Sequence, residues 1–109
     1  MTVNELLDHL ALEVAAGESG LKKEINGGFT GDLLSMVMAN AKEGDIWMTV
    51  QGHENAVAVA VMLGLSAIVL TQGVKPSEIM CQKADENEIP VLTTVLGSYE
   101  MCIEIEKLL

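Results

Sequence analysis

The stretch DIWMTVQGHENAVAVAVMLGLSAIVLTQG, residues 45–73, decides the fold class. It contains two short apolar runs, at 46–50 and 67–71, which are rich in the β-branched and large side chains typical of buried strands. Residues 54–63 lie between these runs and are long enough for a helix. A strand, a helix and a second strand in this order predict a parallel pair joined by a right-handed crossover.

The same unit recurs up to the end of the chain. A third apolar run occupies residues 90–94, and helices are predicted at 77–88 and 98–108. The repeat predicts an α/β fold with βα units from residue 45 to the C-terminus, in which helices pack on a mostly parallel sheet of about four to five strands. Because the segment 54–63 is apolar on nearly every side, we expect it to be deeply covered.

The first 45 residues are less regular. The predicted elements are a helix at 3–10, a strand at 12–16, a second strand at 21–25 and a turn at Asn26-Gly27-Gly28. Thr30 or Asp32 is then expected to cap a further helix. The apolar stripe of that helix consists of Leu33, Leu34, Val37, Met38 and Ala41. No linker interrupts the chain, which predicts a single domain over residues 1–109.

The charge of the chain limits its partners. Six lysines, with no arginine, stand against 16 acidic residues, so that the formal net charge is −10. Nucleic acids and anionic membranes require clustered basic side chains, but the only adjacent pair, Lys22-Lys23, is followed directly by Glu24. We therefore expect neither nucleic acid nor membrane as a partner, and a basic protein is favoured over an acidic one.

Targeting signals and cysteines bear on the compartment. The amino-terminal segment lacks the basic leader and apolar run of a signal peptide, and the longest apolar stretch, at 56–65, is too short to span a bilayer. Cys81 and Cys102 have apolar neighbours at helical spacing, which predicts two buried free thiols in a reducing environment. The sequence thus predicts a cytoplasmic protein.

A candidate binding site follows from the predicted sheet. Ligands of parallel α/β sheets usually lie beyond the carboxyl ends of the strands, where the amino termini of helices converge. Three polar, glycine-containing turns occupy these positions. The candidate ligand-binding residues are Thr49, Gln51, Gly52, His53, Asn55, Thr71, Gln72, Gly73 and Thr93. The alternative is that these residues serve only to form the turns, and neither glycine-rich turn matches a nucleotide-binding fingerprint.

No set of catalytic residues is recognisable. His53 could act as an acid or base, but no serine or cysteine is placed as its nucleophile, and a histidine that caps a helix is the commoner case. The histidines and cysteines lack the paired spacing of a zinc site, so neither a metal nor another cofactor is expected. Trp47 is most simply a core residue, although near a sheet edge it could anchor a partner.

Several stretches together resemble the DRTGG domain family. They are GDLLS at 31–35, VQGHENAVAVA at 50–60, AIVLTQG at 67–73 and IPVL at 89–92. The similarity extends from about residue 12 to the end of the chain. The naming pentapeptide of the family is not present in full. Its nearest counterpart is Leu70-Thr71-Gln72-Gly73, in which Gln72 interrupts the glycine pair that members often carry after the threonine.

The resemblance implies an α/β fold similar to the amino-terminal domain of HPr kinase/phosphorylase. It also implies an accessory role, because DRTGG domains accompany the catalytic domains of some phosphotransacetylases and CBS-domain pyrophosphatases as regulatory or dimerising elements. Single-domain relatives further imply a helper role in anaerobic redox metabolism.

Three functional hypotheses follow. The first is a non-catalytic regulatory or protein-interaction module that works as a homodimer. The second is a sensor that binds a nucleotide or small metabolite at the carboxyl ends of the parallel strands. The third is an enzyme with His53 as base, which ranks last because neither an activated nucleophile nor a metal site can be named. Fold alone does not decide among them.

Overall fold

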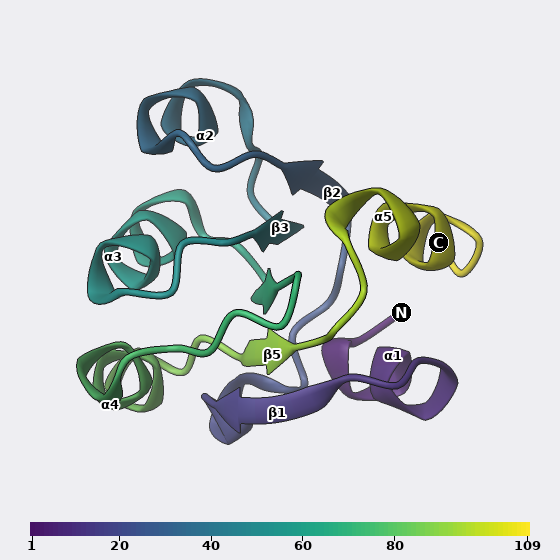
Figure 1. Ribbon diagram of the computed structural model, residues 1–109, viewed down its shortest axis with the longest axis horizontal. Helices are drawn as coiled ribbons and strands as arrows, with labels where there is room; N and C mark the ends of the chain where they lie inside the picture. Colours follow the sequence, from purple (N-terminus) through teal and green to yellow (C-terminus); the bar gives the residue numbers. More distant parts are fainter.

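A computed structural model describes all residues, 1–109, and confirms the mostly parallel α/β fold (Figure 1). The elements are α1 (Val3–His9), β1 (Glu13–Ala16), the 3-10 turn η1 (Glu18–Gly20), β2 (Gly27–Thr30), α2 (Leu34–Asn40), β3 (Asp45–Thr49), α3 (Glu54–Leu63), β4 (Ala67–Leu70), α4 (Glu78–Asn87), β5 (Val91–Thr93) and α5 (Ser98–Glu106). Five strands form one sheet in the order β1-β5-β4-β3-β2. Strands β2 to β5 are parallel, and β1 runs antiparallel to β5 at one edge.

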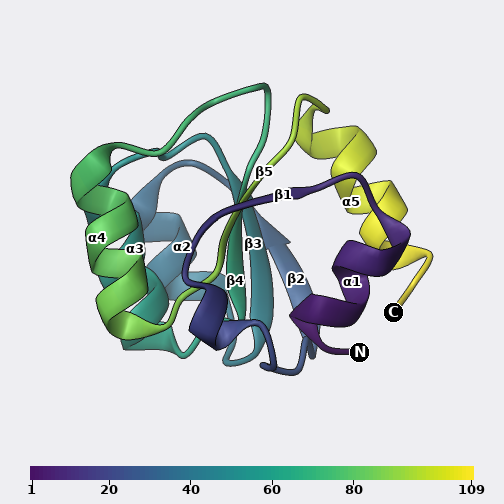
Figure 2. The same cartoon turned by 90° about the horizontal axis from the view of Figure 1, so that it is seen from below.

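The sheet separates two layers of helices (Figure 2). Helices α2, α3 and α4 cover one face, and α1 and α5 cover the other. Side chains of a buried strand alternate between the two faces, so that Ile46 and Met48 belong to the core beneath α1 and α5, whereas Trp47 belongs to the opposite core. Trp47 is fully buried, and its Nε1 donates to the Gly31 carbonyl over 2.8 Å. It is therefore a core residue and does not anchor a partner.

Helix α3 is less covered than its sequence predicts. Its inner side is buried, but Ala58, Val61 and Met62 face solvent, with Val61 47% and Met62 67% exposed. The expectation of deep cover was wrong because a helix in the outer layer of such a fold keeps one face open unless a further element packs over it. No helix of the chain combines the length and apolar character that crossing a membrane requires.

Two predictions for the amino-terminal segment were also wrong. Residues 21–25 form no strand, because their carbonyls bind the first N–H groups of α1: Val3 donates to Lys23 over 3.0 Å and Asn4 donates to Leu21 over 2.8 Å. Of the predicted turn at 26–28, Gly27 and Gly28 are the first two residues of β2. The glycines there permit close approach, since a Cβ on Gly27 would lie 2.9 Å from Asp45 Oδ1 in β3.

The cap and stripe of α2 differ from the prediction as well. Leu33 is the N-cap, and no side chain caps the helix, so neither Thr30 nor Asp32 has this role. Val37 is the buried residue of the predicted stripe, whereas Leu33 and Met38 are exposed. A helix of seven residues at the edge of its layer covers little of the sheet. Asp32 is used elsewhere, as described next.

Candidate site at the carboxyl edge of the parallel strands

The predicted site residues lie at or just beyond the carboxyl ends of β3, β4 and β5, but their exposure differs. Thr49 and Thr71 are fully buried. Gln51, Gly52, His53 and Thr93 are partly exposed, and Asn55, Gln72 and Gly73 are exposed. The two buried threonines thus face the interior, and their hydroxyl groups satisfy partners within the protein.

Asp32 organises the end of β3. Its Oδ1 accepts a hydrogen bond from Thr49 Oγ1 over 2.9 Å and another from the Val50 N–H over 3.0 Å. The Gln51 side-chain amide donates to the backbone carbonyl of Asp32. This carboxylate therefore fixes the segment before α2 to the end of the neighbouring strand. The sequence offered Asp32 only as a helix cap, and no local pattern indicates its contact with β3.

Thr71 connects the end of β4 to helix α5. Its Oγ1 lies 2.8 Å from Ser98 Oγ, and its N–H donates to the Thr49 carbonyl over 3.0 Å. Ser98 is the first residue of α5, so this pair places the beginning of that helix against the sheet. Thr49 and Thr71 thus connect the ends of β3 and β4 to each other and to the segments that follow β2 and β5. Their hydroxyl groups have partners within the chain.

His53 is the N-cap of α3. Its Nδ1 accepts a hydrogen bond from the Asn55 N–H over 3.3 Å, which confirms the capping interpretation of this histidine. The preceding Gly52 lies against the next loop, where its carbonyl accepts from the Ser77 N–H over 2.9 Å. A Cβ at Gly52 would lie 2.9 Å from the Lys75 carbonyl, so this glycine permits the two loops to touch.

A cavity of about 230 Å³ opens at this edge beside β5. Its lining consists of Ala11, Glu13, Gly73, Val74, Lys75, Thr93, Thr94 and Val95. Of the predicted site residues, only Gly73 and Thr93 are among them. Lys75 and Thr94 follow the strand ends in the sequence, so the same reasoning could have included them. Glu13 comes from the antiparallel strand β1, and no sequence pattern indicates that β1 pairs with β5.

The chemistry available here suits binding better than catalysis. The cavity offers one ammonium group, one carboxylate and two threonine side chains. No three His, Cys, Asp or Glu side chains lie together in a way that could hold a metal ion. Both cysteines are half-buried, less covered than predicted, and burial raises the pKa of each thiol. Neither is therefore an activated nucleophile.

The sequence profile of the DRTGG domain matches residues 5–108 of the chain. The chain belongs to the DRTGG domain family. Among solved structures, the DRTGG domain is similar to the CBS and DRTGG domains of the regulatory region of Clostridium perfringens pyrophosphatase, complexed with its activator diadenosine tetraphosphate. The two share 23% identity and a TM-score of 0.70, over 95% of this chain and 45% of that one. This likeness shows the fold, and the present chain spans less than half of that structure. No curated protein matches the chain.

The turn that corresponds best to the DRTGG pentapeptide keeps an unusual backbone. Gln72 and Gly73 both have positive φ, of 62° and 74°. Their N–H groups donate to the carbonyls of Leu96 and Thr94, over 2.8 and 3.0 Å. Gln72 thus adopts a conformation that favours glycine, at the position where the family often carries the first glycine of its pair. The two amides join the β4 and β5 ends to one another and are not free to bind an anion.

Proposed function

We propose that this DRTGG domain is a non-catalytic regulatory module that works as a homodimer through helix α5. The observation that carries the proposal is an exposed apolar surface on α5 and the loop before it. This α5 surface consists of Val95, Leu96, Tyr99 and Ile103. Val95 is 87% exposed and Tyr99 is 78% exposed. Large apolar side chains exposed this close together along the chain are typical of a protein-binding surface, and an exposed tyrosine is a frequent interface anchor.

A two-fold pairing of α5 would cover this surface with a second copy of the chain. A shallow groove of about 390 Å³ follows the helix past Tyr99 and Ile103 to Lys107. If two α5 helices pair antiparallel about a two-fold axis, Lys107 of one copy approaches Glu100 near the beginning of the other. The arrangement is self-complementary, as a two-fold interface must be. It would bury the tyrosine and bring Lys107, which pairs with Glu104 of its own helix over 3.5 Å, near Glu100 of the other copy.

The hydrogen bonds at the carboxyl edge support the non-catalytic part of the proposal. The groups that could carry chemistry there serve structural roles: Thr49 binds Asp32, Thr71 binds Ser98, and His53 caps α3. An enzyme that used His53 as its base would need a nucleophile next to a free imidazole. The side chains of Thr49, Thr71 and His53 are instead engaged in these structural hydrogen bonds.

Sedimentation velocity at micromolar concentrations tests the dimer. We expect the wild-type chain to sediment as a dimer and Tyr99→Glu to sediment as a monomer with an unchanged circular dichroism spectrum. Ile79→Glu is the matched control, because Ile79 is an exposed apolar residue of α4 on the other face, 52% exposed. A monomeric wild type, or equal loss of the dimer in both variants, would contradict the proposal.

A second candidate function is that of a nucleotide or metabolite sensor, which the cavity beside β5 favours. Lys75 supplies a cation to that cavity, and the neighbouring Thr93 and Thr94 supply hydrogen-bonding groups. The structural neighbour binds diadenosine tetraphosphate in its regulatory region. A ligand that binds only the folded chain raises its melting temperature. We expect a concentration-dependent rise with an adenine nucleotide that Lys75→Gln abolishes and Lys107→Gln retains. Equal rises in both variants would place binding elsewhere.

A helper role in redox metabolism would act through a partner protein. The thiols of Cys81 and Cys102 have a pKa raised first of all by burial, so neither supplies a reactive thiolate at neutral pH. The redox chemistry would therefore belong to the protein that this domain binds.

A further inference from the structure

Strand β2 is a free edge of the sheet. It pairs with β3 on one side and has no neighbouring strand on the other, and β1 forms the opposite edge. Figure 1 shows β2 at the end of the sheet, with α2 on one side of it and α5 on the other. A strand at such an edge exposes backbone N–H and carbonyl groups that can pair with another strand.

The backbone of Gly27 and Phe29 carries these free groups. The Asn26 N–H donates to the Gly44 carbonyl over 2.8 Å, so Asn26 points its backbone toward β3. Because alternate residues of a strand point the same way, Gly27 and Phe29 point their N–H and carbonyl groups away from β3. None of the backbone hydrogen bonds made by turns, loops and helix caps reaches them. The Ile25 N–H is already bound to the Met1 carbonyl, so the free edge begins at Gly27.

The two edges of the sheet are protected to different degrees. Strand β1 carries the charged Glu13 and has an irregular register between Val14 and Ala16, and both features oppose pairing with a further strand. Strand β2 has the sequence GGFT, with neither a charge nor a proline, and its register with β3 is regular. The β2 edge is therefore the one that is open to a partner.

The segment that contains β2 is almost free of charge. Residues 25–41 carry one charged side chain, Asp32, although charged residues make up 20% of the chain. Only Ile25 and Val37 of this segment are buried, so the lack of charge belongs to the surface. The chain as a whole has a net charge of −10, which makes two copies repel each other. At the β2 edge two copies can approach with little of this repulsion.

Apolar side chains flank β2 on both faces of the sheet. On one face, Met36 and Met38 of α2 are exposed, and methionine adjusts readily to the shape of an apolar partner. On the other face, a cavity of about 270 Å³ lies between β2 and α5. Its lining includes Thr30 from the strand and Cys102 and Leu109 from the helix side. A partner strand at this edge would thus meet further contact surface on either side.

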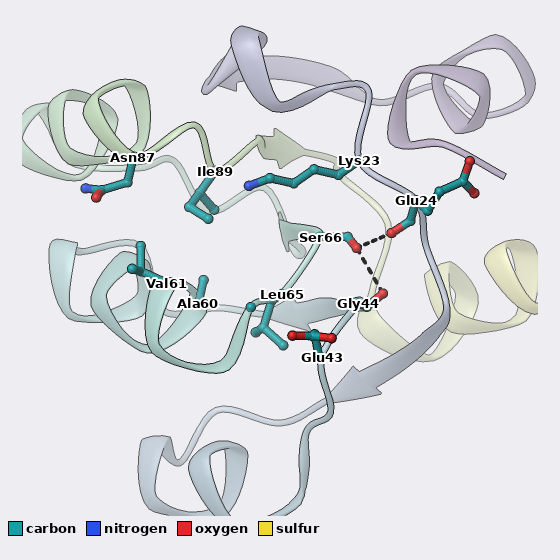
Figure 3. Close-up of a pocket in the computed structure, with 11 residues that line it drawn as sticks. Lys23, Glu24, Glu43, Gly44, Ala60, Val61, Leu65, Ser66, Asn87 and Ile89 are labelled. Carbon is teal, nitrogen blue, oxygen red and sulfur yellow. Dashed lines mark hydrogen bonds between the residues drawn. The ribbon is translucent and has the colours of Figure 1, made fainter.

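Side chains of neighbouring elements hold the segment that leads into β2. Ser66 Oγ binds the carbonyls of Glu24 and Gly44 (Figure 3). Lys23 Nζ donates to the Glu88 carbonyl over 2.6 Å. Lys23 and Ser66 line a cavity of about 350 Å³ at the amino edge of the sheet, and these bonds engage both side chains. A strand that is already ordered loses little conformational entropy on pairing, which favours association.

We propose that β2 pairs antiparallel with β2 of a second copy, so that the two five-stranded sheets form one continuous sheet. The inference rests on the homodimer proposed above and places its two-fold axis at Gly28. With the two Gly28 residues opposite each other, Gly27 of each copy exchanges a pair of hydrogen bonds with Phe29 of the other. All the free backbone groups of the edge are then paired.

The same axis relates the helices of both layers. An axis perpendicular to the sheet sets α5 antiparallel to α5 of the other copy, as the dimer through α5 requires. On the opposite face it brings the two α2 helices, with Met36 and Met38, toward each other. Stable interfaces bury roughly 800 Å² per partner, and a strand of four residues buries only part of that area. The helices supply the rest.

Gly28 provides the test, because a side chain fits there without disturbing the chain. A Cβ at this position would meet no atom closer than 3.6 Å. Gly28→Glu places two carboxylates opposite each other at the axis, Gly28→Gln has nearly the same size without the charge, and Gln82→Glu adds an equal charge to the exposed surface of α4. We expect sedimentation velocity to give a dimer dissociation constant about tenfold higher for Gly28→Glu, with an unchanged circular dichroism spectrum. The other two variants should stay within about twofold of the wild type.

Hydrogen exchange of the wild type locates the pairing without any variant. The amide protons of Gly27 and Phe29 should exchange at least about tenfold more slowly in the dimer than in the dilute monomer. The Gly31 N–H already donates to the Met48 carbonyl over 3.2 Å, so its exchange should not depend on the concentration.

The outcomes separate this pairing from the α5 surface. If Tyr99→Glu abolishes the dimer and Gly28→Glu does not, or if Gly27 and Phe29 exchange equally fast in monomer and dimer, the pairing is wrong and the α5 dimer stands. If Gly28→Glu abolishes the dimer and Tyr99→Glu does not, the pairing stands and the α5 surface fails. Equal weakening by Gln82→Glu and Gly28→Glu would also overturn the pairing, and a monomeric wild type would overturn both proposals.

Discussion

The hydroxyl of Thr49 donates a hydrogen bond to the carboxylate of Asp32 over 2.9 Å, and Thr49 is fully buried. The same Asp32 oxygen accepts the Val50 N–H over 3.0 Å. A side chain that precedes α2 therefore accepts the first backbone N–H after β3 as well as the hydroxyl of the last residue of that strand. This relationship makes Asp32 a structural residue of the carboxyl edge.

We accordingly predict that Asp32→Ala lowers the free energy of unfolding by about 1–3 kcal/mol, because a buried hydroxyl loses its charged acceptor. Urea denaturation followed by circular dichroism measures the change. Asp8→Ala is the control with the same change in charge, since Asp8 is exposed on α1 and makes no such bond, and its effect should stay within about 0.5 kcal/mol.

A double-mutant cycle with Thr49→Val sharpens this test. When Thr49 has already lost its hydroxyl, removal of the Asp32 carboxylate should cost less than in the wild type. Additive effects of the two substitutions would mean that the 2.9 Å contact contributes nothing to stability.

The part of the fold after residue 45 could be predicted because its strands are buried on both faces. Runs such as AIVLT at 67–71 admit few alternatives when a helix of ten residues precedes them and another follows. The amino-terminal part depends on contacts between distant residues. The sequence of Gly27 and Gly28 at the beginning of β2 resembles a turn. In the structure a glycine is needed at position 27 of the strand because the Asp45 side chain lies too close for a Cβ.

The residues of the candidate site were predicted by place, but of their roles only the helix cap formed by His53 was predicted. Sequence position puts Thr49, Thr71 and His53 at the carboxyl edge, where the structure has them. It could not reveal that Asp32 and Ser98 would bind the two threonines, because these partners are 17 and 27 residues away in the chain. The contribution of Glu13 to the cavity depends in the same way on the pairing of β1 with β5.

Helix α4 ends at a residue under backbone strain. Glu88 has φ of 57°, the left-handed conformation in which glycine is favoured at this position. We predict that Glu88→Gly raises the free energy of unfolding by about 0.5–1 kcal/mol, since relief of strain exceeds the added entropy of the unfolded chain. Lys23 keeps its bond, because it binds the Glu88 backbone carbonyl.

Gly64, the equivalent end of α3, provides the opposite substitution. Its φ is 70°, so Gly64→Ala should destabilise the protein by about 1–2 kcal/mol in the same urea titration. If Glu88→Gly also destabilises, the side chain of Glu88 contributes more than its backbone costs.

The thiols should react slowly with alkylating agents. Burial, followed by the nearby Asp85 and Glu78 carboxylates, raises the pKa of Cys81, and burial raises the pKa of Cys102. A raised pKa leaves less thiolate at a given pH, and the thiolate is the reactive form. We predict that iodoacetamide at pH 7.5 modifies both cysteines more slowly in the folded chain than in urea. Mass spectrometry of peptides gives each rate separately, and fast modification of either one in the folded chain would revive a redox role for that thiol.

His53 offers the clearest separation between a structural role and a chemical one. As the N-cap of α3 it accepts the Asn55 N–H through Nδ1, so His53→Ala should lower the free energy of unfolding by about 0.5–1 kcal/mol. Serine is a better cap than alanine, and His53→Ser should therefore restore the loss. A role of the imidazole in binding or proton transfer could not be restored by serine. We expect both variants to keep any melting-temperature rise that nucleotides cause in the wild type. If the rise in melting temperature disappears in both variants while His53→Ser keeps wild-type stability, the imidazole contacts the ligand and His53 has a role in binding.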